Sequence, residues 1–225
     1  MPDETRLKRY TTLAAAADML VEKRLALLNP AKWQDTNDTY FLSVFQEMVG
    51  ANGIYAACFT QAAETYHHWQ VFAGDNEGVC VEFDREALLG FLMDASASYR
   101  WGDMKYRTLA QVDVRKRINV YELPFLKRKG FADEKEFRLL FHSRSAQQPV
   151  HYIDIERTWV KRIIFNPWIS EPLFQSLKTT LQTTPGCSNV AIVRTSLIDN
   201  VKWKSACDRV EELPRVKKPP PRSIW

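Results

Sequence analysis

The hydrophobic positions of this chain follow two periods, which predicts a mixture of helices and strands. The stretch of residues 58–84 shows both patterns. Its first half is typical of a strand end followed by a short helix that carries Trp69 and Phe72, and its second half alternates with period two from Val79 to Phe83. Two strands on either side of an aromatic helix could form the wall of a ligand pocket. Aromatic side chains at helical spacing are nevertheless most often core residues, so both interpretations stay open.

The same patterns predict further elements along the chain. Strands are predicted at residues 7–10, 25–28, 54–60, 104–106, 134–141, 152–155, 160–165 and 190–195. Helices are predicted at residues 13–24, 38–50, 85–95 and 171–181, and over much of residues 107–130 with a break near Pro124. Because strands and helices are interleaved without a convincing linker, we expect one α+β domain over residues 1–213. The basic, proline-rich residues 214–225 are predicted to be an extended, mobile tail.

Polar residues mark the starts of three predicted helices. Thr11 or Thr12 is expected to cap the first helix, Asp38 the second and Asp84 the one after the central stretch. The expected apolar face of the second helix consists of Phe41, Val44, Phe45 and Met48. The expected buried stripe of the helix after Asp84 consists of Leu88, Leu89, Leu92 and Met93.

One predicted strand has charged side chains along a single face. Between residues 134 and 141 the apolar side chains point to one side, while Glu134, Glu136 and Arg138 point to the other. This pattern has two interpretations. The three groups could form a cross-strand salt bridge on an exposed face, or they could form the floor of a site in which Arg138 orients a carboxylate.

Composition and charge narrow the classes of protein only slightly. The chain has 225 residues, 45% of them hydrophobic, and a net charge of +4, which permits a nucleic-acid partner without requiring one. The basic segment of residues 115–129 is interpreted either as a solvated face or as a nucleic-acid contact. The N-terminus has no apolar signal core, and no apolar run of 18 residues is present. We therefore expect a cytoplasmic protein without a membrane partner.

The familiar motifs of several enzyme classes are missing from the sequence. It contains no phosphate-binding loop, no dinucleotide-binding glycine pattern, no zinc-protease or deaminase motif and no nucleophile elbow. The four cysteines form no C-x-x-C pair, and adjacent His67 and His68 would point about 100° apart on a helix. We expect no metal site.

Seven short blocks occur in a fixed order, and together they resemble a known family. They are Lys8-Arg9-Tyr10, Trp33-Gln34-Asp35-Thr36, Cys58-Phe59-Thr60, residues 69–73, residues 78–84, Lys105-Tyr106 and residues 134–138. Their types and order resemble a widespread bacterial family of domains of unknown function, over residues 7–181. The chain has Gln34 and Thr36 where that family usually has Asn and Pro. It has Phe72 where the family usually has Tyr, which removes a hydroxyl group.

The layout of these blocks also resembles, more distantly, the ADP-ribosyltransferase fold, with mostly antiparallel sheets flanked by helices. That resemblance implies NAD as the substrate, with Arg9 and Tyr10 on the first strand as binding residues. It implies that Trp69 and Phe72 enclose the nicotinamide and that Arg138 is a further residue that binds the cofactor. The catalytic acid would be Glu136 or, as the second choice, Glu134.

The resemblance implies an NAD-dependent toxin or phage-defence effector that transfers ADP-ribose to a nucleic acid or a protein. Cleavage of the nicotinamide–ribose bond builds oxocarbenium-like charge, which a nearby carboxylate stabilises. An antitoxin or another protein is an expected partner. Two alternatives remain: a nucleic-acid-binding or nuclease-type effector that uses the basic segment, and a non-catalytic interaction protein in which the strand at residues 134–141 is structural.

Overall fold

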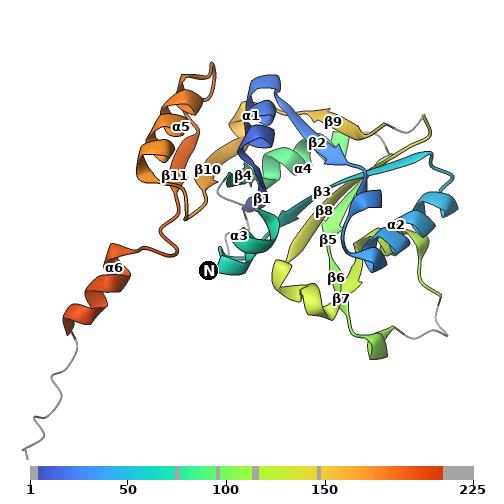
Figure 1. Ribbon diagram of the computed structural model, residues 1–225. Helices are drawn as coiled ribbons and strands as arrows, with labels where there is room; N and C mark the ends of the chain where they lie inside the picture. Colours follow the sequence, from blue (N-terminus) through green and yellow to red (C-terminus); the bar gives the residue numbers. More distant parts are fainter. Residues whose placement is uncertain (1–4, 74–76, 95–96, 113–116, 146–147, 210–225) are drawn as a thin grey trace, which may run out of the picture.

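A nine-stranded sheet organises the computed structural model, which describes residues 5–73, 77–94, 97–112, 117–145 and 148–209 (Figure 1). Its strands are β1 (Arg6–Thr12), β2 (Arg24–Leu28), β3 (Gly53–Thr60), β4 (Gly78–Asp84), β5 (Tyr99–Asp103), β8 (Glu136–Ser143), β9 (Val150–Asp154), β10 (Val160–Phe165) and β11 (Ala191–Arg194). The main path runs β11-β10-β4-β1-β3-β2-β9, and β8 joins β3 to β5. All pairings are antiparallel except that of β10 with β11. The predicted α+β class with a mostly antiparallel sheet is confirmed.

The sheet opens between its two halves. Strand β3 pairs with β8 along its whole length, but it meets β1 at the single register pair Lys8–Thr60 and meets β2 at the single pair Leu28–Ala56. Strand β1 instead pairs along its length with β4. Because β1 and β3 separate beyond their one contact, side chains from both strands can line a space between them.

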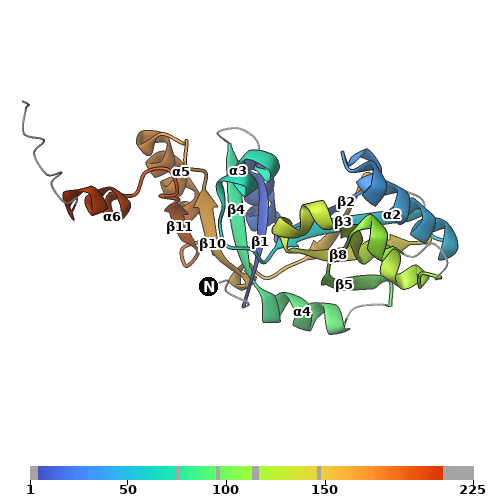
Figure 2. The ribbon, with the colours of Figure 1, turned by 90° about the horizontal axis from the view of Figure 1, so that it is seen from below.

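Helices cover both sides of this sheet. They are α1 (Leu13–Glu22), α2 (Thr36–Met48), α3 (Tyr66–Phe72), α4 (Arg85–Asp94), α5 (Glu171–Thr183) and the short α6 (Val201–Lys204). Figure 2 shows α2 and α3 on one side of the sheet and α4 on the other. The largest core joins the strands to α1, α4 and α5, and a smaller core places Leu42 and Phe45 of α2 against Ile54 and Leu140. The smaller core fixes α2 beside β3 and β8.

Two of the three predicted helix caps are confirmed and the third is wrong. The Thr12 side chain accepts a hydrogen bond from the N–H of Ala15, and Asp84 accepts one from the N–H of Ala87. Helix α2 is capped by Asp35, however, whose Oδ1 accepts from the N–H groups of Asn37 and Asp38. The helix therefore begins earlier than expected, and Asp38 is free to turn inward. Met48 and Met93, both predicted to be buried, are largely exposed.

The basic segment is not the long helix that was predicted. It consists of the 3₁₀ turns η2 (Leu109–Gln111), η3 (Val120–Phe125) and η4 (Lys129–Glu134), with strand β7 (Leu126–Arg128) between the last two. Strand β7 pairs in parallel with β6 (Lys105–Arg107). Pro124 has no backbone N–H to donate and so interrupts the hydrogen bonds of a helix. Its residues 113–116 lie outside the described residues.

The predicted strand at 134–141 also begins later than expected. Strand β8 starts at Glu136, because Lys135 adopts a left-handed conformation (φ 42°) that ends η4. Glu134 therefore belongs to the turn, while Glu136 and Arg138 share one face of the strand. That face is buried, so the interpretation as an exposed salt bridge is wrong.

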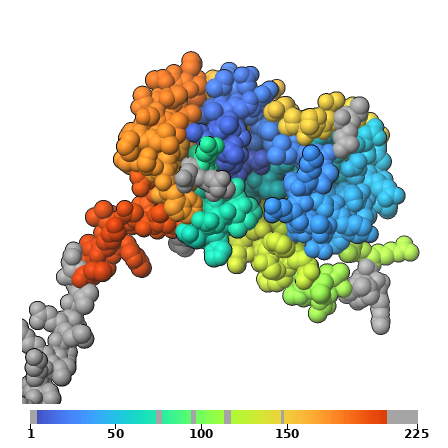
Figure 3. All heavy atoms as spheres, in the orientation of Figure 1, coloured from blue at the N-terminus to red at the C-terminus, as the bar shows by residue number. Residues whose placement is uncertain are grey.

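The C-terminal end of the described chain leaves the body of the molecule at α6 (Figures 1 and 3). The predicted tail of residues 214–225 lies outside the described residues. Within the described part of the chain, no helix is long and apolar enough to cross a membrane.

Candidate functional site

A cavity of about 480 Å³ lies where β1 and β3 separate. Its walls come from β1, β3, β8, the end of α3, the turn before α2 and the segment that contains Lys127 and Glu134. In Figure 3 the surface is hollowed between α3 and the segment that leads into α2. The volume falls in the range of about 300–1,000 Å³ that is usual for small-molecule sites.

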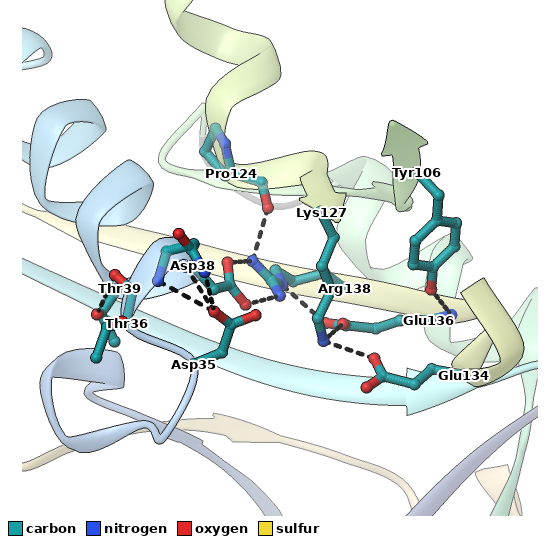
Figure 4. A network of polar contacts seen from close by, with 11 residues as sticks. Asp35, Thr36, Asp38, Thr39, Tyr106, Pro124, Lys127, Glu134, Glu136 and Arg138 are labelled. Atoms are coloured by element: carbon teal, nitrogen blue, oxygen red, sulfur yellow. Dashed lines mark hydrogen bonds and ion pairs between the residues drawn. The ribbon is translucent and has the colours of Figure 1, made fainter. Parts of the chain in front are cut away.

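Glu136 is the buried acidic centre of this cavity (Figure 4). One of its carboxylate oxygens accepts a hydrogen bond from Nε of Arg138 at 2.8 Å, and the other accepts one from Nζ of Lys127 at 2.9 Å. Lys127 also contacts Glu134 at 2.5 Å. The backbone N–H of Glu136 donates to the hydroxyl of Tyr106 at 2.8 Å. Both the position and the charge of the Glu136 carboxylate are therefore fixed by the protein.

Arg138 is completely buried and holds this acid in place. Its two terminal nitrogens donate to both carboxylate oxygens of Asp38, at 2.8 and 2.6 Å, and one of them also donates to the carbonyl of Pro124. The indole of Trp33 lies 5.1 Å from its guanidinium carbon. Arg138 was predicted to bind the cofactor, but its donors are engaged within the protein. Its position instead supports the interpretation that it orients a carboxylate.

The charges around Glu136 keep it ionised. Burial alone would raise its pKa, but the adjacent Arg138 and Lys127 lower the pKa to about 2. Burial alone would lower the pKa of Lys127, but the carboxylates of Glu136 and Glu134 outweigh this and raise it. Burial raises the pKa of Glu134 despite its contact with Lys127. Of the two candidate acids, Glu136 has the pKa of a permanent negative charge at neutral pH.

Two cations on β1 lack acidic partners. Arg9 donates to the carbonyl of Cys58 at 3.3 Å, and Lys8 donates to the carbonyl of Ala62 at 3.1 Å. Within the described ranges neither side chain forms an ion pair, although both line the cavity. Burial lowers the pKa of Arg9. This wall of the cavity is suited to an anion.

Tyr10 and Phe72 form an aromatic side of the cavity, and His68 contacts both rings without lining it. The imidazole of His68 stacks against Phe72 at 6.0 Å and lies 5.6 Å from Tyr10. Tyr10 and Phe72 line the cavity, and 42% of Phe72 is exposed. Trp69 does not line it, so the prediction that its indole encloses the ligand is corrected. The indole is fully buried, packs edge-on against Tyr10 at 4.9 Å and donates to Glu64 at 2.7 Å, and it therefore supports Tyr10 from behind.

The cavity brings together six of the seven side chains predicted for the site. They are Arg9, Tyr10, Phe72, Glu134, Glu136 and Arg138. The sequence interpretation missed Lys127, which was placed in a basic segment interpreted as a solvated face or a nucleic-acid contact, and Asp38, which was assigned to a cap. No local pattern links Asp38 to Arg138, since 100 residues separate them. His68 could have been linked to Phe72, because residues four apart on a helix are neighbours.

The described part of the chain contains no group of three or more His, Cys, Asp or Glu side chains that could hold a metal ion.

Comparisons with known proteins give one family match and several distant structural likenesses. A family model described as "Protein of unknown function (DUF2971)" matches residues 68–139. A comparison with curated proteins finds no match.

Three similar solved structures are of DarT from Thermus sp. 2.9. The complex with NAD+ has a TM-score of 0.44 and 10% identity and covers 86% of this chain and 96% of that one. The complex with ADP-ribosylated ssDNA has a TM-score of 0.45 and 10% identity and covers 86% and 95%. The complex with carba-NAD+ has a TM-score of 0.43 and 12% identity and covers 87% and 97%. Likeness at this level does not assign a function to this chain.

Proposed function

We propose that this protein is an NAD-consuming ADP-ribosyltransferase with Glu136 as its catalytic carboxylate. One observation carries the proposal: unpaired cations, exposed aromatic surface and a permanently ionised, positioned carboxylate share one cavity. NAD offers a partner for each of these features, namely a diphosphate, a flat cationic ring and a ribose on which positive charge develops.

The diphosphate of NAD fits the β1 wall of the cavity. Lys8 and Arg9 supply two positive charges that form no ion pair with a described carboxylate, and Arg binds phosphate oxygens through two parallel donors. The nicotinamide ring fits the aromatic side of the cavity, where Phe72 and Tyr10 offer ring surface to a cation. Phe72 provides this surface without a hydroxyl group, so contact with the ring is apolar at that point.

The reaction uses the negative charge of Glu136. The bond between C1′ of the ribose and the nicotinamide nitrogen breaks, and its electron pair stays with the nicotinamide, which leaves as a neutral molecule. Positive charge develops on the ribose, and the ionised Glu136 stabilises it. A lone pair of the acceptor then forms the new bond to C1′, and the acceptor releases its proton to solvent. Lys127 and Arg138 restrict the motion of the carboxylate and so preorganise it.

The test is incubation of the purified protein with labelled NAD and cell lysate. Glu136→Gln should reduce nicotinamide release by about 10²–10³-fold, because the neutral amide cannot stabilise the developing cation. Glu171→Gln is a matched control, since it removes an exposed ion pair with Arg194 far from the cavity. Thermal unfolding and NAD titration of both variants separate loss of chemistry from loss of folding. The absence of both NAD binding and nicotinamide release in the wild type would contradict the proposal and favour a non-catalytic interaction protein.

Expression in a bacterial host tests the proposed role as a toxin or defence effector. We expect growth arrest with the wild type and none with Glu136→Gln at equal protein levels. Normal growth with an enzyme that is active in vitro would reject the toxin role while leaving the chemistry intact.

A further inference from the structure

A second cavity of about 610 Å³ adjoins the first. It is bordered by the start of α2, by β6 and β7, and by η2. Asp35, Asp38 and Lys127 line both cavities, so a single layer of side chains separates them. A ligand in the second cavity would therefore lie next to the space assigned to NAD. This second space is called the acceptor cavity below.

The acceptor cavity has exposed apolar walls. Tyr40 on α2 is 64% exposed and Leu109 on η2 is 69% exposed, although both line the hollow. The ring of Phe41 lies 6.4 Å from that of Tyr40 and adds to the same wall. Large apolar side chains that surround a concave surface mark a binding site more often than scattered exposed ones do. The walls suit a flat apolar group.

Two guanidinium groups stand side by side at the same cavity. Arg107 and Arg128 are direct register partners in the parallel pair of β6 with β7, so their side chains leave the same face of that ribbon. Both are exposed, and neither forms an ion pair with a described residue. Neighbouring Lys105 and Lys127, by contrast, each contact a glutamate. Like charges placed directly opposite one another repel, and an anion between them would remove this cost.

We propose that the acceptor cavity binds a nucleotide of single-stranded nucleic acid. The base packs against Tyr40 and Leu109, and the backbone phosphate lies between Arg107 and Arg128. This assignment rests on the proposed function, and it names nucleic acid as the acceptor of ADP-ribose. In a nucleic-acid strand, flat bases alternate with phosphates, so one base can lie against the apolar wall while its phosphate lies between the two arginines. In a single strand the base is unpaired, and it is therefore free to enter the cavity. An acidic peptide would use the arginines but not the flat wall.

The test measures binding of fluorescently labelled DNA and RNA oligonucleotides by anisotropy, without NAD. The outcome thus does not depend on whether the protein consumes NAD. The double variant Arg107→Gln/Arg128→Gln should bind at least about tenfold more weakly than the wild type. The slope of log affinity against log salt should also decrease, by about 0.7 for each phosphate contact that is lost.

Two further variants separate stacking from charge. Tyr40→Ala should weaken binding by about tenfold, because a stacked base loses its ring partner, while the salt slope stays unchanged. The control Arg144→Gln/Lys178→Gln removes two positive charges without touching either cavity, and it should bind as the wild type does.

Three results would overturn the assignment. They are no oligonucleotide binding by the wild type, equal losses in the control and in the Arg107/Arg128 variant, and equal binding of a poly-glutamate peptide. If oligonucleotides bind as expected but NAD is neither bound nor cleaved, the nucleic-acid site stands and the proposed transferase function fails.

Discussion

Two groups of charged side chains line the same cavity and differ in what neutralises them. Around Glu136, each charge has a protein partner within 2.5–2.9 Å: Asp38 holds Arg138, Arg138 and Lys127 hold Glu136, and Lys127 also holds Glu134. On β1, Lys8 and Arg9 donate to backbone carbonyls and form no ion pair with a described carboxylate. The charges of the first group are balanced within the protein, whereas those of the second group would be balanced by a bound anion.

The difference separates residues that build the site from residues that await a ligand. A buried ion costs several kcal/mol of desolvation, which only close, well-directed partners offset. The network around Arg138 meets that condition and so fixes Glu136. The β1 cations do not meet it, and their uncompensated charge favours binding of a phosphate. Mutations in the network around Arg138 should therefore lower stability, whereas mutations of the β1 cations should lower NAD affinity with little loss of stability.

The largest expected effect is that of Asp38→Asn on stability. The amide cannot balance the fully buried Arg138, which also keeps only part of its bidentate contact. Loss of one partner from a buried ion pair costs about 3–5 kcal/mol of unfolding free energy. Urea denaturation at pH 7 measures this change.

Asp18→Asn is the matched control for that experiment. Asp18 also contacts an arginine, Arg24, through two oxygens, but both side chains are about one-third exposed or more. Solvent screens such a pair, so we expect a loss of at most about 1 kcal/mol. Similar losses in the two variants would show that the Asp38–Arg138 pair has no special structural role.

The next effect is a loss of stability in acid that depends on Glu136. Its pKa is about 2 in the folded protein against an ordinary 4.5, so the ionised form favours folding. The stabilisation is fully present above pH 4.5 and disappears as the pH falls toward 2. Its full size is roughly 3 kcal/mol, because each pKa unit corresponds to about 1.4 kcal/mol.

Comparison of the wild type with Glu136→Gln isolates this contribution. The difference between their unfolding free energies should be largest at pH 5–7 and should shrink steadily between pH 4.5 and 2. A difference that does not change with pH over this interval would mean that the network around Glu136 does not lower its pKa.

The sequence predicted the elements of this fold better than it predicted the contacts between them. Short stretches rich in apolar residues placed strands β3, β4 and β10, because the composition of a largely buried strand is a local property. The basic segment was predicted wrongly, because charge alone does not distinguish a solvated helix from turns held by distant contacts. Strand β5 was not predicted at all, since its side chains are all partly exposed or exposed and show no alternation.

The site shows the same division between local and long-range information. The order of the sequence blocks indicated Arg9 and Glu136, and both line the cavity. The pairing of Asp38 with Arg138 depends on how α2 packs against β8, which no local pattern encodes. Trp69 stands on the correct helix but points into a small core with Cys80 and Ile164, because its full indole can be buried there. Helical spacing could not decide which face of α3 turns toward the cavity.

The smallest expected change in stability is that of Arg9→Gln, which tests the unpaired group. The loss of its hydrogen bond to the Cys58 carbonyl and the relief of its desolvation act in opposite directions, so the unfolding free energy should change by less than about 1 kcal/mol. NAD affinity should nevertheless fall by about tenfold or more, since a charge-assisted contact to phosphate is lost. Arg162→Gln on β10 is the control, because Arg162 already faces Glu82 at 3.4 Å and lies outside the cavity. Calorimetric titration with NAD and urea denaturation of both variants give the two quantities. Loss of stability without loss of NAD affinity would place Arg9 with the structural network, and the contrast between paired and unpaired charges would no longer hold.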